Sequence, residues 1–220
     1  MVLRPILLLW ILSVGVAAAQ SVQMAALNPQ SARLIRDVVV AAESRFTKLP
    51  KVRLTSDLGR ACNGPSANRM IQYCTDQNVI FVAADLADVV SSAEAAAYMV
   101  AHVYGHAVQV RHGQATIALR AIRAEPAREG ALRGMVTRQV ECIAGVIYGQ
   151  VMPKTALSAL FAAEPFTGSH WGRTPLSGGP AVSIGLSARD EWFQRGQDAN
   201  DVAACGVGDM GVEPLLRARR

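Results

Sequence analysis

The sequence predicts a mainly helical α+β domain with a small sheet beside one buried central helix. Three observations point to this fold class. Several long stretches have apolar residues at helical spacing, and two short extended segments, at residues 52–54 and 79–82, precede the central helix. The second is a β-branched and aromatic run. Four cysteines follow an export signal, which predicts disulfides. At 220 residues, with no linker-like stretch in the middle, the chain is long enough for one domain with a sizeable core.

Residues 1–19 have the composition of a secretory signal peptide. They contain one basic residue, Arg4, an apolar run from Pro5 to Val16, and three alanines at the end. A membrane anchor is the alternative, but a helix needs about 20 apolar residues to span a bilayer and this run is shorter. We therefore expect a mature protein that begins near Gln20, lies in the periplasm or outside the cell, and has no transmembrane anchor.

The formal net charge of +5 is weak evidence about partners. The basic residues are scattered except at residues 215–220, LLRARR, so we expect a domain over residues 20–214 followed by a loose basic tail. This pattern does not predict a nucleic-acid partner.

The four cysteines allow three disulfide connectivities in an oxidising compartment. Cys62 and Cys74 flank a short polar segment, which suggests a local disulfide and leaves Cys142 to pair with Cys205. Zinc ligation by cysteine is the alternative, but the sequence has no C-x-x-C pair.

The first helix is predicted to begin at Asn28 and Pro29, with Asn as the cap and Pro at the first helical position, and to end at Leu49 and Pro50. Its apolar residues at helical spacing are Leu34, Val38, Val39 and Ala42. The two extended segments, 52–54 and 79–82, should then form a small sheet.

The central helix is predicted to begin at residues 91–94, SSAE, which form a capping box, and to end at Gly113. Gly105 lies inside it. Because glycine costs about 1 kcal/mol in a helix interior relative to alanine, Gly105 predicts close approach of another backbone.

His102 and His106 lie four residues apart on this helix. Positions i and i+4 share one face, so both imidazoles can point at one ion. The spacing is that of the zincin motif H-E-x-x-H, in which the Glu acts as general base. Val103 stands in the place of that Glu.

The second half of the chain is predicted to be helical with one long loop. A short helix and a surface loop should occupy residues 115–133, a second buried helix should run from about Leu132 to Val151, and another helix should follow Pro153. Residues 164–185 are rich in Gly, Pro and Ser and predict a long loop.

The final helix is predicted over residues 187–197. Ser187 and Asp190 should form its capping pair, and Trp192 and Phe193 should anchor it to the core.

Four motifs, in this order, resemble those of the bacterial neutral zinc metallopeptidase family. They are Cys62-Asn63-Gly64 with Tyr73-Cys74, residues 101–109 (AHVYGHAVQ), residues 137–145 (TRQVECIAG), and residues 192–196 (WFQRG) ahead of Cys205. The match covers most of the mature chain. The resemblance implies a zincin-like single domain with a small sheet beside the H-x-x-x-H helix, and it supports the disulfides Cys62–Cys74 and Cys142–Cys205.

The chain departs from the family at the residues that carry the chemistry. The family's catalytic Glu falls on Val103, and its third metal ligand, also a Glu, falls on Thr137. An Asp that steadies a ligand histidine in related zincins falls on Glu141. A family histidine ahead of the final helix has no counterpart at Ser183 or Ile184.

A catalytic zinc usually has three protein ligands, and the resemblance supplies only His102 and His106. Glu141 or His112 could serve as a substitute. His112 falls at the spacing of the longer metzincin pattern, but Gln109 stands where that pattern needs a turning Gly. The sequence therefore gives weak grounds for a zinc cofactor.

Val103 cannot take a proton from water, and general-base catalysis typically contributes about 10²- to 10⁴-fold. We expect a catalytically inactive homologue of a secreted neutral zinc metallopeptidase whose groove binds a peptide or a protein partner, as a regulator. The alternative is a divergent, active zinc metallopeptidase with a site rebuilt from Glu141, His112 or His170.

Overall fold

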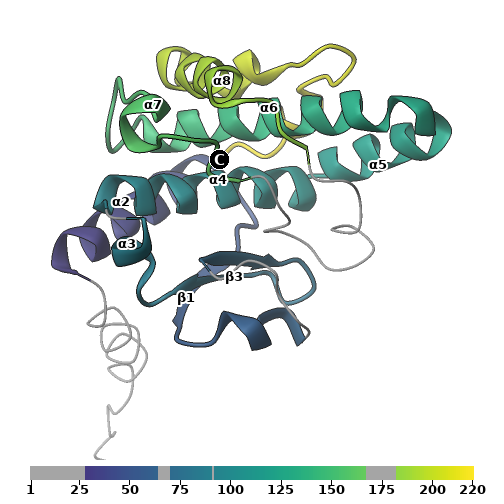
Figure 1. Cartoon of the computed structure of the whole chain (residues 1–220). Coiled ribbons are helices and arrows are strands. Elements are labelled where there is room, and N and C mark those ends of the chain that lie inside the picture. Colours follow the sequence, from purple (N-terminus) through teal and green to yellow (C-terminus); the bar gives the residue numbers. More distant parts are fainter. Residues whose placement is uncertain (1–27, 64–69, 91, 167–181) are drawn as a thin grey trace, which may run out of the picture.

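The computed structural model describes residues 28–63, 70–90, 92–166 and 182–220. The predicted signal peptide and the expected start near Gln20 lie outside these residues. The described chain is mainly helical, with one three-stranded sheet and two disulfides, as the sequence predicted. Figure 1 shows α6 and α8 stacked above α4, and the sheet beneath α4.

The first described helix, α2, spans Pro29–Arg45 and begins as predicted. The side chain of Asn28 caps it by accepting a hydrogen bond from the backbone N–H of Gln30 at 2.9 Å. The helix ends earlier than predicted because Phe46 adopts an extended conformation and pairs with Arg219 in an isolated β-bridge.

The sheet has the strand order β1-β3-β2. The predicted strands are β1 (Lys51–Thr55) and β3 (Val79–Ala83), which pair in parallel. A third strand, β2 (Ile71–Cys74), pairs antiparallel with β3 and was not predicted. It is short and follows the polar segment after Cys62, so its composition gave little signal.

The central helix, α4, spans Ala93–Arg111 and is buried on every side from residue 95 to residue 109. A helix that is apolar all round is a core helix, which the sequence predicted. Its cap is Ser92, whose Oγ accepts from the N–H of Ala95 at 3.1 Å. The predicted capping box is wrong, because the third helical position is then Ala95 and not Glu94. Gly113 follows the helix with φ +90°, the left-handed conformation expected of a stop.

A helix, α5 (Gln114–Ala124), and a short 3₁₀ turn, η2 (Pro126–Arg128), lead directly into α6 (Glu129–Tyr148). The predicted surface loop is therefore only the turn at Pro126. Proline fits there because the first residues of a helix need no N–H partner.

Glycines set how closely the helices of the core approach. A Cβ added at Gly105 of α4 would lie 2.8 Å from the carbonyl oxygen of Val140 on α6, which confirms the close approach predicted from this residue. At the crossing of α6 with α8 (Leu186–Ala199), a Cβ on Gly145 or Gly196 would lie 2.0 Å from a carbonyl oxygen of the other helix. These contacts bring α6 against α4 on one side and α8 on the other.

The predicted cap of α8 is wrong. The helix begins after Gly185, which has φ +81°, and no side chain caps it. Asp190 instead accepts a hydrogen bond from the N–H of Leu157 at 2.7 Å, at the start of α7 (Leu157–Leu160). This single turn is the helix that the sequence predicted after Pro153. Phe193 is fully buried and anchors α8, as predicted.

The basic end of the chain is packed and not a loose tail. The segment η3 (Val202–Cys205) leads to α9 (Glu213–Leu216); Leu215 within α9 and Ala218 just after it are fully buried. The N–H of Arg220 donates to the carbonyl of Arg45 at 3.0 Å. The sequence contained no sign of this packing, because one leucine and one alanine in a short arginine-rich segment form no periodic pattern.

Both predicted disulfides are present, Cys62–Cys74 and Cys142–Cys205, and they account for all four cysteines. Zinc ligation by cysteine is therefore excluded in this oxidised form. Across the part of the chain that the structure describes, none of the helices has the length and apolar character needed to cross a membrane.

Candidate functional site

The two histidines of α4 lie side by side in the core. Their ring centroids are 5.0 Å apart in an edge-to-face arrangement, and the exposed fractions are 1% for His102 and 4% for His106. The helical spacing thus places them together as predicted.

Glu141 faces this pair from α6, and its Oε1 lies 3.2 Å from Nδ1 of His102. Burial lowers the pKa of His102 even though the carboxylate opposes the shift, so the imidazole is neutral at pH 7. A neutral imidazole facing a carboxylate carries its proton on Nδ1 and has its lone pair on Nε2. This is the histidine–carboxylate contact that the resemblance implied for Glu141.

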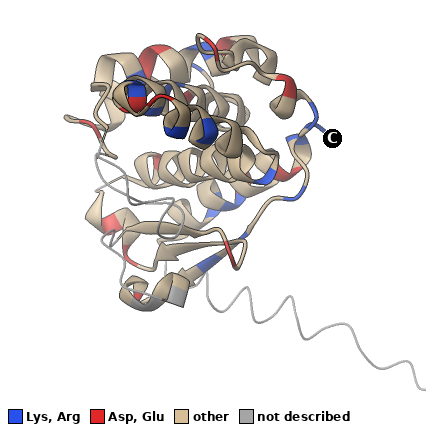
Figure 2. Ribbon diagram, turned by 90° about the vertical axis from the view of Figure 1, so that its right-hand side faces the viewer, with Lys and Arg blue, Asp and Glu red and all other residues tan. Residues whose placement is uncertain are grey.

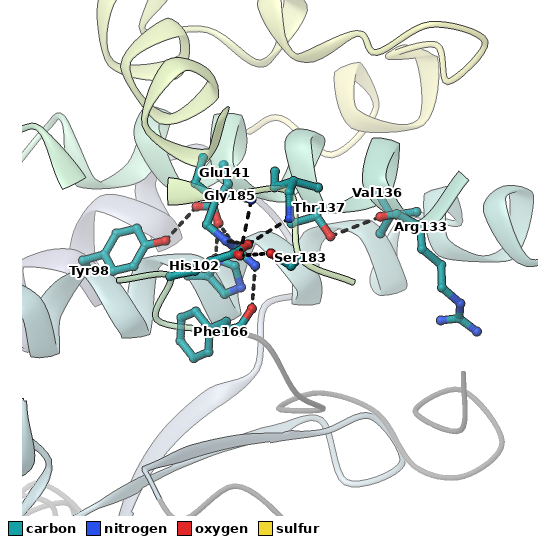
Figure 3. Close-up of polar contacts among 12 residues, drawn as sticks. Tyr98, His102, Arg133, Val136, Thr137, Glu141, Phe166, Ser183 and Gly185 are labelled. Carbon is teal, nitrogen blue, oxygen red and sulfur yellow. Dashed lines mark hydrogen bonds and ion pairs between the residues drawn. The ribbon is translucent and has the colours of Figure 1, made fainter. Parts of the chain in front are cut away.

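Two further donors hold the same carboxylate (Figure 3). The Tyr98 hydroxyl donates to Oε2 at 2.8 Å, and Nη1 of Arg189 donates to Oε1. Burial raises the pKa of Tyr98 far above its usual value, so this hydroxyl stays protonated. Burial alone would raise the pKa of Glu141, but its contacts with His102, Arg189 and Tyr98 outweigh burial and lower the pKa. Glu141 is therefore a buried, ionised and fully engaged group.

Arg189 links three parts of the chain at the centre of the molecule. It projects from α8 with 1% of its surface exposed. Besides Glu141, its guanidinium donates to Oε1 of Glu164 at 2.6 Å and to the carbonyl oxygen of Phe166 at 2.5 Å. Sequence reasoning missed this residue. The available signal was its position four residues before Phe193, which places a charge on the apolar face of the helix.

Glu164 forms hydrogen bonds with residues 183–185, just before α8. Its carboxylate accepts from the hydroxyl of Ser183, from the N–H of Ile184 at 3.1 Å and from the N–H of Gly185 at 3.3 Å. Beside it, the ring of Phe166 stacks on His102 at a centroid distance of 4.2 Å. Figure 3 shows Phe166, Ser183 and Gly185 gathered around His102 and Glu141.

The positions where the family carries its other functional groups hold residues that make structural contacts. Val103 is completely buried and belongs to the apolar core. The hydroxyl of Thr137 donates to the carbonyl of Arg133 at 3.1 Å, within its own helix.

The structure does not bring His112 to the pair. His112 caps the far end of α4, where its Nε2 lies 2.9 Å from the carbonyl oxygen of Thr47. His170 lies outside the described residues. Within the described ranges, no three His, Cys, Asp or Glu side chains are grouped as a metal site.

The described residues therefore fit a catalytic zinc poorly. They offer two histidines where three protein ligands are usual, and the nearest carboxylate already bonds to an arginine. The positive charge of Arg189 lies beside the carboxylate of Glu141, where it would repel a divalent ion at His102.

No family model, curated protein or solved structure matches this chain. The resemblance to the neutral zinc metallopeptidases therefore rests on the sequence motifs alone.

Proposed function

We propose that this protein is a catalytically inactive homologue of the secreted neutral zinc metallopeptidases, and that it acts by binding a peptide or protein. The observation that carries the proposal is the state of Glu141. It is the acidic side chain best placed to replace the missing ligand, yet it is fully buried and held by Arg189, Tyr98 and His102.

Two features support an inactive protein: the catalytic Glu is absent, and Glu141 is already bonded to other side chains of the protein. A zinc peptidase needs metal-bound water and a carboxylate that takes its proton. Val103 supplies no such carboxylate, and the guanidinium of Arg189 supplies a positive charge next to Glu141 without any metal. The negative charge of Glu141 is balanced by the positive charge of Arg189, and buried charges are generally paired in this way.

The alternative is a divergent, active zinc metallopeptidase with a rebuilt site. One observation favours it, because the contact of Nδ1 of His102 with Glu141 puts the ring's lone pair on Nε2, as in histidines that ligate metals. A third ligand would have to come from residues other than His112, which is bonded to Thr47.

Metal content and peptide hydrolysis test the proposal. The folded protein is equilibrated with zinc and dialysed, its zinc content is measured, and it is incubated with a mixture of unstructured casein peptides. We expect less than stoichiometric zinc, a melting temperature that a chelator leaves unchanged, and peptides that co-elute with the protein uncleaved. Stoichiometric zinc with chelator-sensitive cleavage would establish the alternative.

A further inference from the structure

A second candidate site lies at the junction of α2 with the C-terminal segment, and none of its lining residues belongs to the histidine cluster. It is a cavity of about 180 Å³. Its polar lining comes from Arg45, Asp201, Arg219 and Arg220, and the buried side chains of Phe46 and Val146 contribute its apolar lining.

The lining side chains carry a net positive charge, with three guanidinium groups and one carboxylate, which is paired with Arg219. Two further basic residues lie near the loop that follows α2. The loop that carries Lys48 is bonded to Ala218, and both Lys48 and Arg111 lie close enough to His112 to lower its pKa, after the larger effect of burial. Figure 2 shows blue segments around the C-terminal end of the chain and further blue segments below it on the same side.

The arginines are held in place by the protein and still have unused donors. Arg45 donates to the backbone oxygen of Asn200 at 2.9 Å and to its side-chain oxygen at 2.6 Å. Arg219 donates to Asp201, and Nε of Arg220 donates to the carbonyl of Phe46 at 3.4 Å. Each guanidinium has five N–H donors, and these bonds use only one or two of them.

We propose that this cavity binds a phosphate group, carried by a small phosphate ester or by a lipid headgroup. Drug-sized ligands fill pockets of about 300 Å³ or more, so a cavity of this size suits one small anionic group. Arginine is the side chain that recognises phosphate oxygens in pairs, and a doubly charged phosphate complements three guanidinium groups and one carboxylate better than a singly charged carboxylate does.

Titration of the folded protein at low salt tests this site. The probes are inorganic phosphate, glycerol phosphate and acetate, followed by phosphatidylcholine vesicles with and without phosphatidic acid, whose headgroup is a phosphomonoester. The variants are Arg45→Gln and Arg220→Gln, and the matched control is Arg36→Gln, which removes the same charge from an exposed position of α2 outside the cavity. Melting temperatures show that each variant is folded.

We expect the phosphate probes to bind more tightly than acetate, and each cavity variant to weaken binding at least about tenfold while the control changes it less than about twofold. Binding of soluble glycerol phosphate identifies an ester ligand, and binding only to phosphatidic acid vesicles identifies a headgroup. Acetate binding as tight as phosphate, no binding of any phosphate probe, or equal losses in the control and the cavity variants would each overturn the proposal.

Discussion

Arg189 shows how one buried charge organises the polar centre of this molecule. Its guanidinium has three acceptors from two other parts of the chain, Glu141, Glu164 and the carbonyl of Phe166. A buried ion pair is weak evidence for stability by itself, but removing one partner leaves the others buried and uncompensated. Removing the guanidinium of Arg189 should therefore lower the free energy of unfolding.

We predict that Arg189→Met lowers the free energy of unfolding by about 3–5 kcal/mol, because Glu141 keeps its burial and loses its cation. Arg195→Met is the matched control. Arg195 is exposed and stacks on Trp192 at 4.2 Å, a contact that contributes about 0.5–1 kcal/mol at such sites. Urea denaturation measures both, and equal losses would contradict the assigned role of Arg189.

His112 should make stability depend on pH. Burial, with Lys48 and Arg111 nearby, lowers its pKa in the folded state below the usual value of 6.5. The unfolded chain then binds the proton more readily, so this contribution to stability is present above about pH 6.5 and is lost as the pH falls toward the folded pKa. Unfolding curves between pH 5 and 7.5 should show a shallower decline in His112→Gln than in the wild type. An unchanged slope would count against this assignment.

At the scale of elements, helix contacts depend on glycines that tolerate no side chain. Gly105→Ala should lower the free energy of unfolding by about 1–3 kcal/mol, since the new methyl group would lie 2.8 Å from the carbonyl oxygen of Val140. Helix propensity alone predicts the opposite sign, a gain of up to about 1 kcal/mol. Gly130→Ala separates the two effects, because its added methyl group would have no atom within 4 Å among the described residues. Thermal unfolding should show loss for the first variant and no loss for the second.

The sequence predicted the elements whose signals are local. Asn28 with Pro29 marked a helix start, the run at residues 79–82 marked a strand, and Gly105 marked a close contact. Each of these signals depends only on neighbouring residues or on one backbone constraint. The sequence pattern did not predict contacts between residues that lie far apart in the chain. Asp190 caps another helix, and the buried role of Arg189 requires carboxylates from two distant segments.

At the scale of the whole molecule, helix packing places Glu141 of α6 against the histidine pair of α4. Glycine contacts hold α6 against α4, so that Glu141 reaches His102, and a disulfide from Cys142 to Cys205 fastens the same helix to the segment after α8. The candidate site could be predicted as a histidine pair with two missing groups. The neutralisation of Glu141 by Arg189 could not, because no motif contains that arginine.

Restoring the missing groups should separate metal binding from catalysis. Thr137→Glu should raise zinc affinity, since it adds a third ligand where the family carries one, yet leave peptide hydrolysis at background for want of a base. Thr116→Glu, the same change at an exposed position of α5, is the matched control and should leave zinc affinity unchanged. Zinc titration and a peptide assay measure the two effects.

Val103→Glu alone should give no peptidase, because its carboxylate would have no firmly held metal-bound water to activate. It should also lower stability, since position 103 is fully buried in the apolar core and an unpaired carboxylate there is costly. With Thr137→Glu and zinc present, the two changes together should yield chelator-sensitive hydrolysis that neither gives alone, because the base and the ligand act as one unit. Circular dichroism checks that each variant is folded. If Thr137→Glu fails to raise zinc affinity, α6 is aligned wrongly with the family motif, and if the wild type itself hydrolyses peptides in a chelator-sensitive way, the protein is an enzyme.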